Sequence, residues 1–478
     1  MPKNRTKVVV IGLDGANINT ANLVGLNTKY IHNFISTIPP YTPPAWTSIL
    51  TGVTPAKHGI IDFQRIDPKE LTVNIATSRD VKYYRISELL SMHGLKSVLI
   101  NLPMTYPFEG IKFKENTVIV SDWAAPYQEI YPKRLNEKYK EYLIDPPHSW
   151  EKHIDNPSGY AKRVEEYTTT RLNIYYDLLE DWDWDLYFIV FSETDWFSHI
   201  FPQILEGKDT HLVYGVFKKI KKFIDKAMNI ADITFIVSDH GFEIKRKIFY
   251  VNEALARLGF LRYNKTKASF VRFGKKIIPS KIAKILATRG TNQMSYATDP
   301  QKRKAFMLSH ATWGVYVTDK TLKEQVKKAL ESFPEISKVV LKEEIYTGPH
   351  IQLLPDLFIV PKDGIKFSRD LSGKLTETTY QGDHEIHGIL GALGEGINSE
   401  ITFRHLPTVY DIAPTILHIF NFPIPSDMDG RVLMEIFKED SEFVKRKPKY
   451  VDPSYYRIKQ KDEKLKKAIK HLKLKGKI

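Results

Sequence analysis

The segment Ile38–Asp62, IPPYTPPAWTSILTGVTPAKHGIID, places Thr42 between prolines and ahead of a Thr-Gly pair and a His-Gly pair. Proline fixes φ, cannot donate a backbone hydrogen bond, and pushes the preceding residue toward an extended conformation. We therefore expect Thr42 in a stiffened turn that can hold a nucleophile. A threonine hydroxyl becomes nucleophilic only with help from a base or a metal ion. The rest of the chain must supply that group if Thr42 reacts.

Apolar, β-branched runs alternate with helical patterns around this segment. The runs at 7–13 (KVVVIGL), 96–102 (KSVLINL), 186–191 (LYFIVF) and 233–237 (ITFIV) are typical of strands buried on both faces. Helical spacing predicts helices at 80–93, 211–228 and 411–420, and further strands of the same sheet at 356–360 (DLFIV) and 388–393 (GILGAL). This alternation predicts a doubly wound α/β fold.

Several classes of function lack their sequence signals. The chain of 478 residues has no cysteine, so neither disulfides nor thiolate metal sites are available. It has no Walker loop and no dinucleotide fingerprint. No apolar signal region precedes Lys7, and the longest apolar runs are far shorter than a membrane span. We expect a soluble, cytoplasmic protein.

The basic charge of the chain is concentrated at its C-terminus. Fourteen Lys and Arg residues and three acidic residues lie in 445–478, so this segment carries +11 of the net charge of +14. Leu465, Ile469 and Leu472 recur there at helical spacing. A basic amphipathic helix of this kind can lie on an anionic membrane or on nucleic acid, and the alternative is a solvated or docked terminal helix.

Acidic and histidine residues follow three of the predicted strands, where ligands gather in open parallel sheets. Asp14 follows the first strand, and Asp195 and His199 are four residues apart, so one helical turn would place both on one face as metal ligands. Their alternative roles are a capping Asp and a surface His. Asp239 and His240 end a buried strand, where an unpaired carboxylate needs a compensating cation.

A set of motifs identifies a family. VIGLDGA, TPPAWTSILTG with HGI, DWFSH, VSDHGF, GDHEIHGILGALGEGI and VYDIAPTILHIFNFPIPSDMDGRVL occur in this order over about residues 7–437. Together they resemble the type I phosphodiesterase and nucleotide pyrophosphatase family of the alkaline phosphatase superfamily. The resemblance implies an alkaline phosphatase-like, mostly parallel sheet flanked by helices. We expect the catalytic domain in 1–440, with inserted cap segments at about 123–160 and 260–345, and a basic, helical tail in 441–478.

The resemblance also implies two divalent metal ions, usually zinc, with manganese as a substitute. Counting back from Thr51 and Gly52 places the nucleophile at Thr42 and not at Thr47, with a phosphothreonine intermediate. One ion is expected at Asp14, Thr42, Asp239 and His240, and the other at Asp195, His199 and a third histidine. For that third ligand, spacing to Gly394 favours His384 over His387.

One position departs from the family pattern. Nucleotide pyrophosphatases have a phosphate-binding Asn 21 residues after the nucleophile, where this chain has Phe63. Nucleotide pyrophosphatase activity is therefore in doubt. The resemblance as a whole implies a phosphate ester substrate, with a phosphodiester favoured over a monoester. The lack of cysteine argues against a sulfatase, and relatives of phosphoglycerate mutase use Ser. Alternatives are a phosphonate hydrolase, a phosphoryl or head-group transferase, and a noncatalytic protein that docks through its basic tail.

Overall fold

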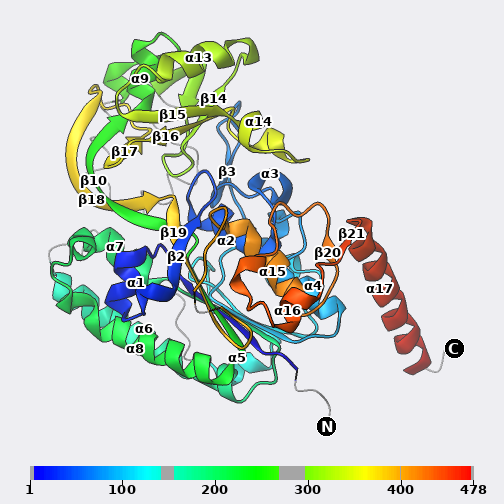
Figure 1. Cartoon of the computed structure of the whole chain (residues 1–478). Helices are drawn as coiled ribbons and strands as arrows, with labels where there is room; N and C mark the ends of the chain where they lie inside the picture. Colours follow the sequence, from blue (N-terminus) through cyan, green and yellow to red (C-terminus); the bar gives the residue numbers. More distant parts are fainter. Residues whose placement is uncertain (1–4, 141–155, 269–296, 399, 475–478) are drawn as a thin grey trace.

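An eight-stranded sheet forms the centre of the molecule (Figure 1). The computed structural model describes residues 5–140, 156–268, 297–398 and 400–474. Across the sheet the strands lie in the order β2 (Ile31–Ile35), β19 (His387–Gly394), β9 (Ile233–Val237), β1 (Val8–Leu13), β8 (Leu186–Phe191), β5 (Ser97–Ile100), β6 (Thr117–Val120) and β7 (Ile130–Tyr131). The five strands from β9 to β6 are parallel, whereas β19 and β7 run antiparallel to their neighbours. The predicted fold class is confirmed.

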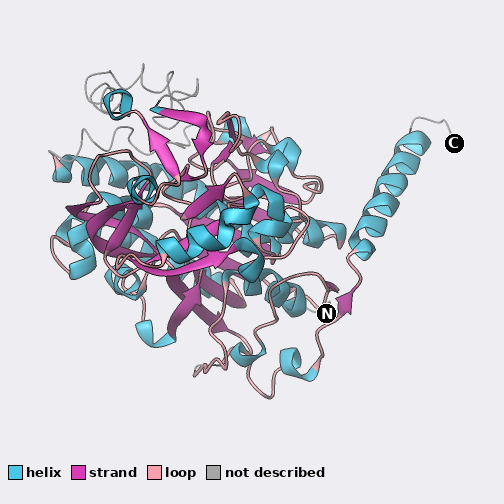
Figure 2. Cartoon of the chain, turned by 90° about the horizontal axis from the view of Figure 1, so that it is seen from above, coloured by secondary structure: helices cyan, strands magenta, loops and turns pink. Residues whose placement is uncertain are grey.

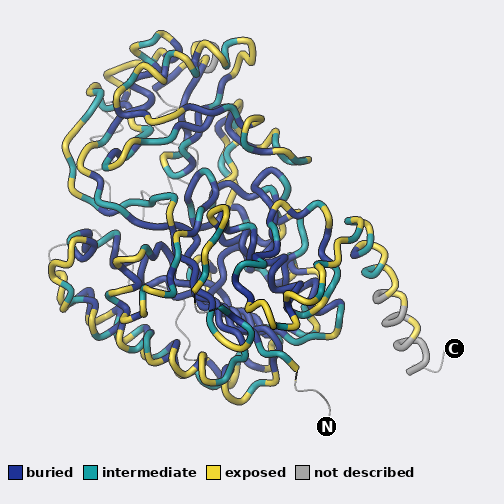
Figure 3. The backbone as a smooth tube through the Cα atoms, in the orientation of Figure 1, coloured by how far each residue is buried: buried dark blue, intermediate teal, exposed yellow. Residues whose placement is uncertain are grey.

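Helices cover both faces of this sheet because its central strands are apolar on both sides. In β1, Val9, Ile11 and Leu13 face one hydrophobic core, while Val8 and Val10 face the other. The first core is covered by α1 (Ile18–Val24), α6 (Pro157–Glu180), α7 (Glu193–Ile200) and α8 (His211–Ile230). The second is covered by α2 (Thr42–Thr51), α4 (Ile86–Met92) and α15 (Ile412–Ile419). Figure 3 shows the sheet as the most buried layer.

A second lobe with its own hydrophobic core lies above the carboxyl edge of the sheet (Figure 1). It contains a four-stranded sheet in the order β13 (Ala305–Met307), β14 (Gly314–Val317), β16 (Leu357–Pro361) and β15 (Ile336–Leu341). Around this sheet lie α9 (Val251–Arg257), α13 (Lys323–Leu330) and α14 (Lys342–Ile345). The prediction that DLFIV at 356–360 joins the main sheet is wrong, because β16 pairs with β14 and β15.

Parts of the predicted cap segments lie outside the described residues, namely 141–155 and 269–296. In the described part of 123–160, β7 adds an edge strand to the main sheet and α5 (Leu135–Lys138) follows it. The core of the second lobe extends beyond 260–345 and takes in Phe249 and Phe367. The boundaries of both segments stay predictions.

A long antiparallel ribbon joins the lobe to the sheet edge. Its strands are β10 (Gly241–Tyr250) and β18 (Thr376–Glu385), with β17 (Ile365–Ser368) on the other side of β10. The register pairs Phe242 with His384 and Gly241 with Glu385. Because β10 begins directly after His240 and β18 ends at Glu385, this pairing brings together two motifs that are about 140 residues apart in the sequence.

A substitution at Gly12 tests the packing of β1 against α2. A Cβ atom at this position would lie 2.4 Å from Cη2 of Trp46 and 2.8 Å from Cγ2 of Val190. We expect Gly12→Ala to lower the free energy of unfolding by about 1–3 kcal/mol, because the buried strand cannot move away from the ring. Urea denaturation measures this loss. In a Trp46→Phe background the Gly12→Ala loss should be smaller, and an equal loss in both backgrounds would contradict the contact.

Candidate metal centre and active site

The predicted site residues gather at the carboxyl edge of the sheet. Asp14 follows β1, and Asp239 and His240 follow β9. Helix α7 starts immediately after β8 and carries Asp195 and His199 on successive turns. Since β1 lies between β8 and β9, these three strand ends are adjacent. The topology of the sheet therefore determines where these groups meet.

Thr42 is the first residue of α2, and this helix is buried along its whole length. Its hydroxyl Oγ1 lies 3.3 Å from Nε2 of His240. The His240 Nδ1 atom lies 3.1 Å from the carbonyl oxygen of Gly241, to which only a protonated Nδ1 can donate. Nε2 is then free of a proton and faces Thr42. Thr47 lies one turn later and donates its hydroxyl to the carbonyl of Pro43, so it is a helix residue and not part of the site.

Asp195, His199 and His384 form a first cluster that can hold a metal ion, with ligand atoms within 4.8 Å of one another. Oδ1 of Asp195 lies 3.6 Å from Nε2 of His199 and 3.5 Å from Nε2 of His384. The two Nε2 atoms are 3.2 Å apart. Two imidazoles and a carboxylate are a donor set that suits zinc.

Asp14, Asp195 and His240 form a second cluster of the same kind, which shares Asp195 with the first. Nε2 of His240 lies 3.9 Å from Oδ1 of Asp14 and 3.2 Å from Oδ2 of Asp239. The His240 and His384 rings stack with centroids 3.9 Å apart. All seven residues predicted from the sequence thus meet at one place, although their roles as ligands stay a prediction.

Buried oxygen atoms without hydrogen bonds indicate that the site is built for cations. Among the described residues, Oδ1 of Asp14, Oδ1 of Asp195 and Oδ2 of Asp239 are buried and accept no hydrogen bond. Each would cost about 1–3 kcal/mol if nothing compensated it. Carboxylate oxygens and imidazole nitrogens converging in this way fit divalent metal ions.

The pKa shifts of the same groups agree with this donor set. Burial raises the pKa of Asp239 to about 7 and, together with the nearby Asp239 and Asp195 carboxylates, holds the pKa of Asp14 well above its ordinary value. Burial also holds the pKa of His240 well below its ordinary range and lowers that of His199. Metal ligation needs ionised carboxylates and neutral imidazoles. His199 and His240 are therefore already neutral near neutral pH, whereas Asp14 and Asp239 need a cation beside them to be ionised. Asp195 and His384 shift in the opposite sense: despite their burial, the pKa of Asp195 is lowered by His199 and His384, and that of His384 is raised by Asp195.

The structure separates the two histidines of the GDHEIHG loop. His384 lies against Asp195 and His199, whereas the His387 side chain is about half exposed and pairs with Glu385. The Glu385 carboxylate also accepts from the backbone N–H of His387. The geometry thus agrees with the choice of His384.

Phe63 lies in an aromatic group that includes Tyr41, the residue before Thr42. Its ring makes edge contacts with Tyr41, 5.7 Å between centroids, and with Trp123, 5.4 Å between centroids. Tyr41 precedes Thr42 in the chain and also lies 5.7 Å from His384. This position therefore supplies apolar contact and no hydrogen-bond donor to the site.

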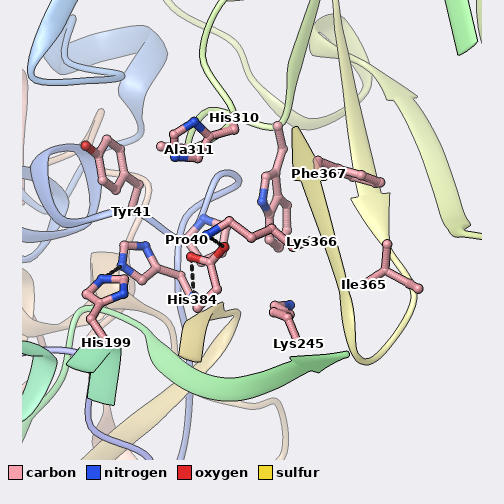
Figure 4. A pocket seen from close by; sticks show the side chains of 12 residues that line it. Pro40, Tyr41, His199, Lys245, His310, Ala311, Ile365, Lys366, Phe367 and His384 are labelled. Atoms are coloured by element: carbon pink, nitrogen blue, oxygen red, sulfur yellow. Dashed lines mark hydrogen bonds and ion pairs between the residues drawn. The ribbon is translucent and has the colours of Figure 1, made fainter. Parts of the chain in front are cut away.

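A cavity of about 230 Å³ lies between the cluster of Asp195, His199 and His384 and the second lobe (Figure 4). His199 and His384 form part of its wall, next to Pro40 and Tyr41. The lobe contributes Lys245, His310, Trp313, Lys366 and Phe367. Sequence reasoning missed these residues because no local motif marks them. Lys245 alone lies near a motif, three residues after the end of VSDHGF, so its position on β10 could have been a signal.

Charges in this cavity are paired. Lys245 pairs with Glu243, and Lys366 pairs with Asp383 at 3.0 Å. Burial lowers the pKa of His310 to about 4, so its ring is neutral near pH 7. Trp313 has φ of 50°, a conformation that bulky residues rarely adopt. Strain of this kind is often kept where a side chain serves a binding site.

Comparison with known proteins identifies the family. The sequence model of the type I phosphodiesterase / nucleotide pyrophosphatase family matches residues 8–389, which includes every predicted site residue. Over a much shorter stretch, the chain is 49% identical to a putative extracellular sulfatase Sulf-1 homolog of Caenorhabditis elegans. That match spans 43 residues, 9% of this chain and only 6% of the sulfatase homolog.

Solved structures share the fold at low sequence identity. Phosphonoacetate hydrolase from Sinorhizobium meliloti, in complex with phosphonoformate, superimposes with a TM-score of 0.57 at 14% identity, covering 86% of this chain and 94% of its own. Human ectonucleotide pyrophosphatase / phosphodiesterase 5 gives 0.51 at 14%, covering 89% and 97%. The alkaline phosphatase PafA gives 0.52 at 16%, covering 92% and 100%. The alkaline phosphatase-like fold predicted from the sequence is confirmed.

His384 and His387 offer a matched test of the first cluster. We expect His384→Ala to weaken zinc binding by about 10-fold or more, because one of three converging ligand atoms is lost. Isothermal titration of metal-free protein with zinc measures the affinity and the number of ions bound. His387→Ala is the control and should leave both unchanged. Equal zinc binding by the two variants would contradict the assignment.

Proposed function

Since this chain belongs to the type I phosphodiesterase and nucleotide pyrophosphatase family, a family of hydrolytic enzymes of the alkaline phosphatase superfamily, we propose that it hydrolyses phosphoric diesters through a phosphothreonine intermediate. The observation that carries the proposal is the position of Thr42. Its hydroxyl lies 3.3 Å from Nε2 of His240, beside two overlapping clusters of carboxylates and imidazoles. The expected metal ions and the expected phosphothreonine intermediate both require Thr42 to lie at this place.

The proposed site is dinuclear. Asp195, His199 and His384 would hold one ion, and Asp14, Asp239, His240 and Thr42 would hold the other. Bound zinc, or manganese in its place, would lower the pKa of the Thr42 hydroxyl and neutralise charge on the phosphoryl oxygens. Asp195 belongs to both clusters, so it is the residue best placed to set their relative position.

The residues of the chain prepare the displacement. Pro43 and Pro44 restrict the first turn of α2 and hold the Thr42 side chain at the sheet edge, where it is 5% exposed. In the first step the Thr42 Oγ1–phosphorus bond forms while the bond from phosphorus to the leaving oxygen breaks. In the second step water cleaves the Oγ1–phosphorus bond and regenerates the hydroxyl. Each step exchanges one phosphorus–oxygen bond for another, so no oxidant or further reactant is needed.

The cavity supports a diester over a monoester. It shares His199 and His384 with the metal-ligand cluster and offers space for a second substituent on phosphorus. Its two lysines are paired with acidic residues, so the cavity does not present a strong positive field to a second phosphate group. Phe63 lacks the amide that nucleotide pyrophosphatases are expected to use, which argues for diesters other than nucleotides.

Replacing the hydroxyl of Thr42 tests the reaction. We expect Thr42→Ala to lower metal-dependent turnover of a bis-aryl phosphate diester by about 1000-fold or more, because the covalent step is lost. The assay compares this diester with the matching aryl monoester in metal-free protein resupplied with zinc or manganese. Thr47→Ala, which removes a hydroxyl one turn away, is the control and should keep its activity. Full turnover by Thr42→Ala would refute the nucleophile.

Failure of the wild-type protein to hydrolyse either ester would exclude the proposed reaction and leave three alternatives. Turnover of a phosphonate instead would favour the phosphonate hydrolase. Transfer to an acceptor alcohol would favour the transferase. Bound metal with no turnover of any of these compounds would favour a noncatalytic protein.

Trp313 tests the role of the cavity. We expect Trp313→Ala to raise KM for the bis-aryl diester by about 10-fold. The substitution removes a large apolar surface from the cavity that would hold the second substituent on phosphorus. Turnover of the aryl monoester should change by less than about twofold, since it has no second substituent. Steady-state kinetics with both esters measures the difference. An equal effect on the two substrates would mean that the cavity does not bind the second substituent.

A further inference from the structure

Helix α17 (Ser454–Leu474) begins on the body of the protein and then projects away from it (Figures 1 and 2). Its first turns are firmly attached. Tyr456 is buried and donates its hydroxyl to the carbonyl of Pro423, and Tyr84 donates to Gln460. Just before the helix, β21 (Tyr450–Val451) pairs with β20 (Ile424–Pro425). The direction of α17 is therefore set by the body.

Exposed apolar side chains lie on one face of α17, one in its attached first turns and two in the projecting part. Ile458 is 57% exposed, Leu465 is 61% exposed and Ile469 is 39% exposed. Their spacings of 7 and 4 residues place all three within a stripe about 40° wide on a helix of 3.6 residues per turn. Exposure of these aliphatic side chains to water is unfavourable, and burying them would lower the free energy. Within the described residues, all three side chains nevertheless remain open to solvent.

Positive charge accompanies this stripe. The sequence of α17 contains eight Lys and Arg residues and two acidic residues. Arg457 and Lys459 flank Ile458 directly, and Arg457 and Lys461 are exposed. The chain before Lys445 carries only +3 of the net charge of +14, whereas α17 alone carries +6. An apolar stripe bordered by lysines matches a surface with anionic headgroups above hydrocarbon.

We propose that α17 docks this protein on the surface of an anionic membrane, with Ile458, Leu465 and Ile469 inserted at the headgroup boundary. None of the described helices is long and apolar enough to cross a membrane, so the helix lies on the surface and does not span it. Docking would place the hydrolase at a lipid surface without adding a residue to its active site.

Two other occupants fit these observations less well. A nucleic acid would match the lysines, but its phosphate backbone would leave the aliphatic stripe in water. A second copy of α17 would cover the stripe, but it would bring two strongly basic helices together. An anionic lipid surface satisfies both the apolar stripe and the charge.

Co-sedimentation with vesicles tests the proposal. The probe is phosphatidylcholine vesicles with about one-third phosphatidylserine, compared with pure phosphatidylcholine vesicles. We expect the full chain to bind the anionic vesicles at low salt, to be released as salt rises to about 0.5 M, and to ignore the neutral vesicles. Leu465→Ser with Ile469→Ser, which keeps every charge, should lower partitioning by about tenfold or more.

Two controls separate docking from folding and from catalysis. Ile75→Ser with Leu406→Ser removes two exposed aliphatic side chains elsewhere and should leave vesicle binding unchanged. A chain ending at Lys461 keeps Tyr456 and Gln460, so its body should stay folded, and it should lose vesicle binding. Hydrolysis of a dissolved diester, measured on the same samples, should be equal in all of them. That readout distinguishes a failure of docking from a failure of the proposed function.

Several outcomes would overturn the proposal. Failure of the full chain to bind anionic vesicles, equal binding to neutral vesicles, or undiminished binding by the Leu465→Ser and Ile469→Ser variant would each contradict docking on an anionic membrane. Binding to an RNA or DNA duplex in place of vesicles would point to nucleic acid. Self-association that disappears with the truncation would point to a second copy of the chain.

Discussion

Three carboxylates, Asp14, Asp195 and Asp239, are buried together at the carboxyl edge of the sheet, and the architecture around them depends on offsetting that cost. Burial of several like charges close together is unfavourable unless cations lie beside them. Among the described residues, the groups that face them most closely are the imidazoles of His199, His240 and His384, and burial keeps the first two neutral. One oxygen of each of the three carboxylates is buried and accepts no hydrogen bond, which is the arrangement expected of a site that binds cations.

The second lobe matters because of how it is attached. The β10–β18 ribbon starts at the Asp239–His240 motif and returns to the sheet edge through His384, so one pairing register completes the first cluster and also carries the lobe. The lobe side chains Lys245 and Lys366 then form the far wall of the cavity that opens beside these ligands. The position of His384 and part of the cavity wall thus depend on the same ribbon. A shift of this register would remove His384 from Asp195 and change the cavity at the same time.

Much of the site was predictable because its residues follow strongly apolar strands. Asp14, Asp239 and His240 directly follow buried parallel strands, and Asp195 and His199 lie on the helix after another, so sequence order alone placed them at one edge. The strand at 356–360 was assigned to the wrong sheet because a short apolar run reads the same in any buried sheet. Trp313 and Lys366 could not be found, since their contact with the site depends on packing between segments far apart in the chain. Long-range contacts of this kind leave no local periodicity in the sequence.

We propose that the edge of the sheet holds two metal ions, with Asp195, His199 and His384 as ligands of one. Anomalous X-ray diffraction at the zinc edge, from crystals of the zinc-loaded protein, tests it most directly. We expect two anomalous peaks, one contacting Asp195, His199 and His384 and the other contacting Asp14, Asp239, His240 and the Thr42 hydroxyl. A single peak, or peaks away from these residues, would contradict it.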